Sequence, residues 1–233
     1  MACLRVYFKE YAKDIEEGVI KMSRILVLGA AGQVAQLVIE QLLKENQHEI
    51  VLYLRHAERL SALAQNPHVT VIEGDVLAQE LLADSLAGVD IVYANLGGQF
   101  EPLMQNVVAT MTAAGIKRLI YISGLGLYHE VPGAFGEWNE QAVGHEVMED
   151  TRRAAKIVEQ SSLNYTILRC AYMTNEDRID YELTEKGTPF KGTIISRRSI
   201  AQVVVDLVNH PEKGIGASWG INQPNIDGDR PIY

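Results

Sequence analysis

The sequence has few cysteines, no long apolar run and little positive charge. Its two cysteines, Cys3 and Cys170, form neither a disulfide framework nor a metal-ligand spacing, which fits a reducing cytoplasm. No apolar stretch is long enough to cross a bilayer. The net charge of −9 argues against a general nucleic-acid binder, because phosphate contacts need a basic face. We therefore expect a cytoplasmic protein that binds neither membranes nor nucleic acid and holds no metal.

The 233 residues, 47% of them hydrophobic, suffice for one large domain with a full core. Residues 1–21 carry several charges and no apolar signal region, and Met22 resembles a natural start. We expect residues 1–21 to be an N-terminal extension outside the core and 22–233 to be a single domain. The alternative is an amphipathic helix that packs on the domain through Val6, Tyr7, Tyr11 and Ile15.

Apolar segments alternate with segments of helical spacing along the chain. The expected strands are 25–29, 49–54, 69–75, 89–94, 118–123, 165–169 and a short last one at 217–221. The expected helices are one running through residue 43, then 57–65, 80–86, 102–114, 141–160 and 199–209. Residues 125–139 and the tail from 223 are expected to be loops, and 170–193 an irregular insert. This alternation predicts an α/β fold with a doubly wound, mostly parallel sheet, helices on both faces and a small C-terminal cap from about 170–193.

A glycine turn follows the first expected strand. The segment 24–35 reads RILVLGAAGQVA, a G-x-x-G-x-x-A pattern between a buried strand and an apolar helix. Glycines there permit a tight turn and let a phosphate approach the backbone, while the helix N-terminus offers free N–H groups. We therefore predict a dinucleotide site with a diphosphate at Gly29, Ala31, Gly32, Gln33 and Val34. An ordinary strand-to-helix turn is the alternative.

The end of the second expected strand indicates which dinucleotide binds. NAD enzymes usually place a carboxylate there for the ribose hydroxyls. Here Leu54 is followed by Arg55, with Arg59 one helical turn further on. Guanidinium groups suit a phosphate, so the residues favour NADP over NAD. The alternative is a solvated basic pair.

Together these pieces resemble the short-chain dehydrogenase/reductase superfamily with its Rossmann-type fold. More closely, they resemble its atypical NmrA-like branch, with flavin reductase/biliverdin-IXβ-reductase-like proteins among the relatives. The matching stretches are 25–35, 52–60, 74–76, 89–98, 118–124, 165–169 and 195–204. The resemblance implies that Asp75 and Val76 flank the adenine, and that Asn95, Leu96 and Gly97 run beneath the nicotinamide ribose. Asp75 as a helix cap and Asn95 as a turn residue are the alternatives.

The resemblance also implies a catalytic set, which this chain only partly keeps. Ser123 stands where the family serine belongs, and Lys156 matches the lysine of Tyr-x-x-x-Lys, but Arg152 replaces the tyrosine. Because arginine is a poor proton donor, the usual alcohol dehydrogenase chemistry is in doubt. We expect NADPH-dependent reduction of a small aromatic acceptor such as a flavin, a quinone or a tetrapyrrole, with Ser123, Lys156 and Tyr128 as catalytic candidates. The expected acceptor pocket consists of Tyr128, Trp138, Tyr172 and Met173, with His129 as a weaker candidate.

Other interpretations remain open. The chain would instead be a catalytically silent NmrA-like redox sensor that binds NADP and a regulatory protein partner. A relative of sugar-nucleotide or isoflavone-type reductases ranks last, because the insert at 170–193 is short for a large substrate domain. Cys170 has no adjacent base and is not expected to be a nucleophile. Ser196 is expected to cap the late helix.

Overall fold

The structure, a computed structural model, describes residues 22–232. Eight strands form the main sheet in the order β3-β2-β1-β4-β5-β6-β10-β8. Their bounds are β1 Ser23–Leu28, β2 His48–Leu54, β3 Val69–Glu73, β4 Ile91–Ala94, β5 Arg118–Gly124, β6 Asn164–Cys170, β8 Glu182–Thr184 and β10 Ala217–Asn222. All neighbours pair in parallel except β8, which runs antiparallel to β10. The predicted α/β class and the mostly parallel sheet are therefore confirmed.

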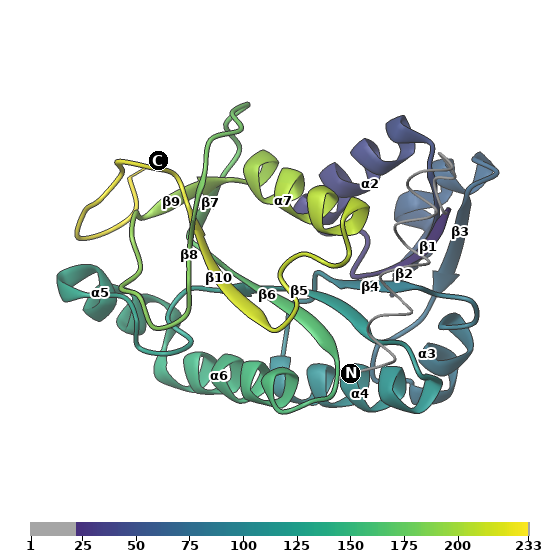
Figure 1. The fold of residues 1–233 in the computed structure, drawn as a ribbon, viewed down its shortest axis with the longest axis horizontal. Coiled ribbons are helices and arrows are strands. Elements are labelled where there is room, and N and C mark those ends of the chain that lie inside the picture. The colour runs from purple at the N-terminus through teal and green to yellow at the C-terminus, as the bar shows by residue number, and fades with distance from the viewer. Residues whose placement is uncertain (1–21, 233) are drawn as a thin grey trace, which may run out of the picture.

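Helices cover both faces of this sheet. They are α2 Gln33–Glu45, the 3₁₀ helix η1 Ala57–Gln65, α3 Gln79–Ser85, α4 Phe100–Ala114, α5 Gly133–Val143, α6 His145–Glu159 and α7 Arg197–Asn209. Figure 1 shows α2 and α7 on one side of the sheet and α3, α4 and α6 on the other. The central strands β4 and β5 are buried on both faces, which is why their sequences are almost continuously apolar rather than alternating, whereas the edge strands β3 and β8 are partly exposed.

The strand β1 illustrates how the two layers form. Ile25 and Val27 belong to the apolar cluster under α2 and α7, whereas Leu26 and Leu28 belong to the cluster under α4 and α6. All four side chains are fully buried. Each contributes about 1.5–3 kcal/mol through removal from water. This rigid central strand fixes the turn that follows it.

The region after β5 differs from the expectation. The predicted loop 125–139 contains the first turns of α5, and the predicted single helix 141–160 is two helices, α5 and α6. The break falls at Gly144, whose φ of +89° an α-helix does not allow. Glycine adopts this conformation without a steric cost, so the chain turns there. The loop prediction was wrong from Gly133 onward because the helix is short and rich in glycine.

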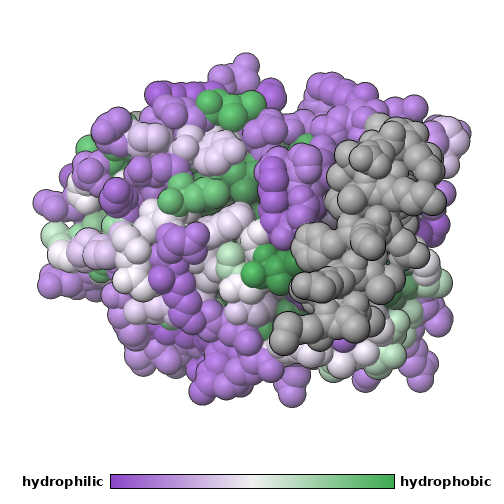
Figure 2. All heavy atoms as spheres, viewed as in Figure 1, coloured by the Kyte–Doolittle hydropathy of each residue, from purple (hydrophilic) through white to green (hydrophobic). Residues whose placement is uncertain are grey.

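The predicted cap is less irregular than expected. Within 170–193 the chain forms β7 Tyr172–Thr174, which pairs with β9 Ile194–Ser196 in a separate two-stranded sheet. The β8 strand instead extends the edge of the main sheet. Hydrophilic side chains cover much of the face seen in Figure 2, with smaller hydrophobic patches between them. Within residues 22–232, no helix is both long and apolar enough to span a bilayer.

Candidate functional site

The strand register brings the predicted cofactor residues to one edge of the sheet. Leu28 is level with Tyr53 of β2 and with Ala94 of β4. The residues that follow these strands, Gly29, Arg55 and Asn95, therefore lie at the carboxyl edge. Strand order reverses between β1 and β4, since β2 continues one way and β4 the other. Ligands of open α/β sheets bind at such a switch point.

Asn95 is packed directly against the glycine turn. A Cβ atom added at Gly29 would lie 2.2 Å from the carbonyl oxygen of Asn95, and one at Gly32 would lie 2.0 Å from its Nδ2. Gly29 also has a φ of +74°. The backbone N–H of Asn95 donates to Leu28 O at 3.0 Å. Both glycines are thus required for the contact between the first turn and the end of β4, a reason that the sequence pattern does not reveal.

The N-terminus of α2 has the character of an anion site. Gly32 is its N-cap, makes no side-chain capping bond, and no acidic residue stands in the first turn. The first backbone N–H groups of a helix lack intrahelical partners, and the helix dipole adds positive potential. Gln33 lies at this end and Val34 is buried behind it. The turn and helix therefore fit a diphosphate.

Arg55 and Arg59 are both exposed beside this turn. Within residues 22–232, neither forms an ion pair with another side chain. Arg59 and Gln33 line one groove of about 790 Å³ along α2 and η1. Two free guanidinium groups near an uncapped helix N-terminus fit a phosphate-bearing ligand.

Asp75 and Val76 follow β3. Asp75 Oδ1 accepts a hydrogen bond from Leu77 N at 2.9 Å, so its carboxylate caps its own turn. The carbonyl oxygen of Asp75 accepts from the Tyr53 hydroxyl, and that of Val76 accepts from Asn106 Nδ2. Both backbone positions are therefore fixed. The following helix α3 begins at Gln79 with Ala78 as its N-cap, so the alternative in which Asp75 caps that helix was wrong, and the adenine contact stays a prediction.

Ser123 lies near the carboxyl end of β5 and is 6% exposed. Its hydroxyl oxygen is buried and makes no hydrogen bond of normal geometry with any described residue, and the same holds for the hydroxyl of Tyr121. Burial raises the pKa of Tyr121 well above its usual value. Unsatisfied buried hydroxyls are uncommon. The Ser123 hydroxyl partly offsets the rise in that pKa through its interaction with Tyr121, and a contact of Ser123 with a bound molecule stays a prediction.

Lys156 does not lie with Ser123. It stands in the last turn of α6, whose next residues lead into the amino end of β6. Because a crossover helix runs antiparallel to its strands, this end of α6 lies away from the carboxyl edge. The lysine side chain is exposed and forms no ion pair within residues 22–232. The structure therefore does not place Lys156 beside a nicotinamide ribose.

Tyr128 also lies away from the expected position. Its hydroxyl donates to Glu159, the last residue of α6, at 2.7 Å, and lies 2.9 Å from the Ser218 hydroxyl at the start of β10. The ring packs beside the Arg169 guanidinium, 5.3 Å from ring centre to Cζ. Burial raises the pKa of Tyr128 well above its usual value. The side chain therefore packs between sheet and helix and does not line the cavity described below, and its role in an acceptor pocket stays a prediction.

Arg152 stands at the position of the family tyrosine, and nothing else in the sequence indicated a role for it. Its side chain is only 10% exposed and pairs with Glu140 and, at 2.6 Å, with Glu149. Its Nε and Nη2 atoms donate to the carbonyl oxygen of Gly126 at 3.1 and 3.0 Å. The two glutamates raise the pKa of Arg152, although burial opposes them. This guanidinium therefore stays charged and ties α6 to the loop after β5.

A buried ion pair also holds the loop that follows β5. Arg169 is fully buried and pairs with Glu130 at 2.7 Å. Glu130 in turn accepts from the backbone N–H groups of Gly126 and Tyr128. A buried pair with additional hydrogen bonds holds its groups in one geometry. The loop from Gly126 to Glu130 is consequently preorganised.

Two of the predicted acceptor residues do meet. Trp138 and Tyr172 pack edge to face with ring centres 5.2 Å apart, and Phe135 stacks on Trp138. The Tyr172 hydroxyl donates to Asn139 Oδ1 at 2.9 Å. Met173 packs against the same core and its carbonyl oxygen accepts from Arg197. These rings form a wall at the end of β6.

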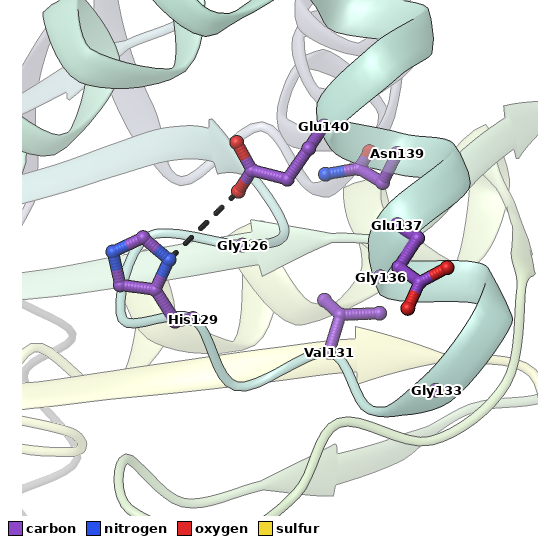
Figure 3. A pocket seen from close by; sticks show the side chains of 8 residues that line it. All are labelled: Gly126, His129, Val131, Gly133, Gly136, Glu137, Asn139 and Glu140. Atoms are coloured by element: carbon purple, nitrogen blue, oxygen red, sulfur yellow. Dashed lines mark ion pairs between the residues drawn. The ribbon is translucent and has the colours of Figure 1, made fainter.

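Beside this wall lies a cavity of about 310 Å³, which we name the acidic cavity. Figure 3 shows the imidazole of His129 and the carboxylate of Glu140 turned toward one another, with Val131 nearby and the helix α5 along one side. His129 adopts a φ of +55°, which is uncommon outside glycine. The lining consists of Gly126, His129, Val131, Gly133, Gly136, Glu137, Asn139 and Glu140. Sequence reasoning missed Asn139 and Glu140, because helix α5 was expected to be a loop.

The remaining candidates have structural roles. Ser196 caps α7 by accepting from Ser199 N at 3.0 Å, as expected. Cys170 is buried, and burial raises the pKa of its thiol well above the usual value, which suits an inert side chain. In the part of the chain that the structure describes, no three His, Cys, Asp or Glu side chains gather as a metal site would need.

Comparisons with known proteins identify the family and the fold. A family model described as NAD(P)H-binding matches residues 29–211. A Rossmann-fold NAD(P)-binding family protein from Shigella flexneri is 41% identical, with a TM-score of 0.77 over 91% of this chain and 99% of that one. A short-chain dehydrogenase/reductase from Veillonella parvula, solved in complex with NADP, is 29% identical with a TM-score of 0.84, over 91% and 99% of the two chains.

Quinone oxidoreductase 2 of Escherichia coli (strain K12) is 30% identical over 149 residues. The match covers 62% of this chain and 47% of that protein, so the chain spans about half the length of this relative. The NmrA-like branch stays a prediction. On the family match, the strand order and the glycine turn at the switch point, the chain belongs to the NAD(P)H-binding family with a Rossmann fold.

Proposed function

We propose that the protein is an NADPH-dependent oxidoreductase that reduces a small aromatic acceptor such as a flavin or a quinone. The observation that carries the proposal is the uncapped α2 N-terminus behind the Gly29–Gly32 turn, with Arg55 and Arg59 exposed beside it. The NADP complex of the Veillonella parvula relative and the name of the Escherichia coli relative support the cofactor and the acceptor class.

The residues at the switch point fit NADPH. The turn and the first N–H groups of α2 would hold the diphosphate, and Arg55 with Arg59 the 2′-phosphate. Asn95, Leu96 and the open backbone of Gly97, where a side chain would meet no atom within 4 Å, would lie under the nicotinamide ribose. When bound, the cofactor supplies a hydride.

The protein's own contribution is positioning rather than acid catalysis. Arg152 keeps its proton, and its guanidinium N–H groups already donate hydrogen bonds to Gly126, Glu140 and Glu149. Lys156 is remote from the carboxyl edge. Ser123 would remain as a hydroxyl that orients an acceptor oxygen, and His129 as a polar side chain in the cavity wall. Flavins and quinones suit such a site because their reduction needs little help from a protein acid.

The direct test combines binding with turnover. Binding of NADPH and NADH is measured by isothermal titration, and the loss of NADPH absorbance is followed with a panel of flavins and quinones. We expect NADPH to bind more tightly than NADH and at least one acceptor class to be reduced. Tight NADPH binding without reduction of any acceptor would refute the enzymatic proposal.

One observation favours the redox sensor as a second function. The guanidinium of Arg152 stands where a proton donor would be expected, and it is locked in ion pairs. A protein that only senses NADP needs no donor. This alternative predicts different affinities for NADP⁺ and NADPH, no turnover, and a protein partner whose retention in a pull-down changes with the redox state of the added nucleotide.

A further inference from the structure

The acidic cavity lies where an acceptor would approach the cofactor site. Gly126 comes two residues after the carboxyl end of β5, and Asn139 binds the hydroxyl of Tyr172 just after β6. Its volume of about 310 Å³ is at the lower end of the range for small-molecule sites. An acceptor of one or two rings is of a suitable size, and a tetrapyrrole is not.

The charges around this cavity are unbalanced. Glu137 and Glu140 line it, and Glu149 lies beside Glu140 on the Arg152 guanidinium. Glu140 and Glu149 share the Arg152 guanidinium, and Glu137 has no ion pair within residues 22–232, so these four side chains carry two net negative charges. The guanidinium already binds both Glu140 and Glu149 together with the Gly126 carbonyl, so it offers little to an anionic ligand.

His129 does not reverse this balance. Its Nδ1 lies 3.9 Å from a carboxylate oxygen of Glu140, so the imidazole faces that carboxylate. Glu137 is exposed at the cavity wall and has no ion pair within residues 22–232. An anionic group that entered would thus meet an uncompensated carboxylate, and like charges at close range repel.

We propose that the acidic cavity selects uncharged quinones of one or two rings and rejects acceptors that carry a sulfonate, phosphate or carboxylate. This inference rests on the proposed function, since it names the acceptor class of the same site. Two net charges at roughly 7 Å from an anionic group, screened as in water, lower its occupancy about tenfold.

The test compares 1,4-naphthoquinone with its 2-sulfonate at saturating NADPH. Each kcat/KM is measured at low salt and at about 1 M salt, where the screening length is about 3 Å. The variant Glu137→Gln removes one cavity charge, and Glu212→Gln, at an exposed position after α7, is the matched control. The readout is the ratio of the two kcat/KM values, which cancels differences in cofactor binding.

We expect the ratio of the uncharged quinone to the sulfonate to fall about tenfold from low to high salt. At low salt, Glu137→Gln should lower the ratio about threefold, whereas Glu212→Gln should not change it. A ratio that responds to neither salt nor Glu137→Gln would overturn the inference. If neither quinone is reduced, the panel of flavins and quinones decides the proposed function separately. Calorimetric binding of the two quinones to the NADP⁺ complex, with the same ratio and variants, then decides the charge preference.

Discussion

Replacing Arg55 by alanine should weaken NADPH much more than NADH. The side chain is exposed and forms no ion pair with a described residue, so its removal costs the fold no known contact. A hydrogen bond between charged groups contributes about 1.5–3 kcal/mol, which corresponds to about 10- to 100-fold in Kd. Because the site is exposed, the effect should shrink as salt rises.

The assay is isothermal titration of both nucleotides into wild type and Arg55→Ala. The matched control is Arg230→Ala, which removes an equally exposed arginine from the C-terminal tail. The thermal midpoint should stay unchanged in both variants. Equal losses for NADPH and NADH, or no loss at all for NADPH, would refute the assignment of Arg55 to the 2′-phosphate.

Three further changes probe the site and the core. Gly32→Ala should lower the free energy of unfolding, measured by urea denaturation, by about 1–3 kcal/mol, because the added Cβ would lie 2.0 Å from Asn95 Nδ2. Adding Asn95→Ala should recover most of that loss. A fully stable single variant would contradict the contact. Lys156→Ala should leave the KM for NADPH within about twofold of the wild-type value, because Lys156 stands in the last turn of α6, away from the carboxyl edge of the sheet. A large rise in KM would instead support a contact between Lys156 and the nicotinamide ribose. Burial raises the pKa of Tyr121, so above about pH 10 the folded state keeps a proton that the unfolded state loses, and the free energy of unfolding should fall as the pH rises. Replacing Tyr121 by phenylalanine should reduce that slope by up to about 1.4 kcal/mol per pH unit. An unchanged slope would contradict this cause.

Most of the fold follows from local pattern. Short apolar segments bounded by turns predicted the strands of the parallel sheet, because burial on both faces leaves no polar alternation. The pattern failed where glycine and tertiary contacts decide. Gly133 and Gly136 lie inside α5, where glycine has low helix propensity, and Gly144 divides a stretch that otherwise has continuous helical spacing.

The parts of the candidate site that depend on the backbone could be predicted from the sequence, and the parts that depend on side-chain packing could not. The phosphate turn needs only glycines and a helix N-terminus, so Gly29 and Gly32 were identified from spacing. Side chains that act at a distance could not be placed in this way. Tyr128 follows a strand end as an acceptor residue would, yet the buried Arg169–Glu130 pair holds its loop so that the ring lies under α6.

Arg152 links these observations. A guanidinium that is 10% exposed and held by Glu140 and Glu149 is a fixed positive charge, and removing it would leave two carboxylates facing each other beside the cavity. Its bonds to the Gly126 carbonyl also define one cavity wall. The same side chain therefore stands in place of the usual proton donor and shapes the proposed acceptor site. A site built in this way favours acceptors whose reduction is controlled by hydride transfer and geometry, since it supplies position in place of acid.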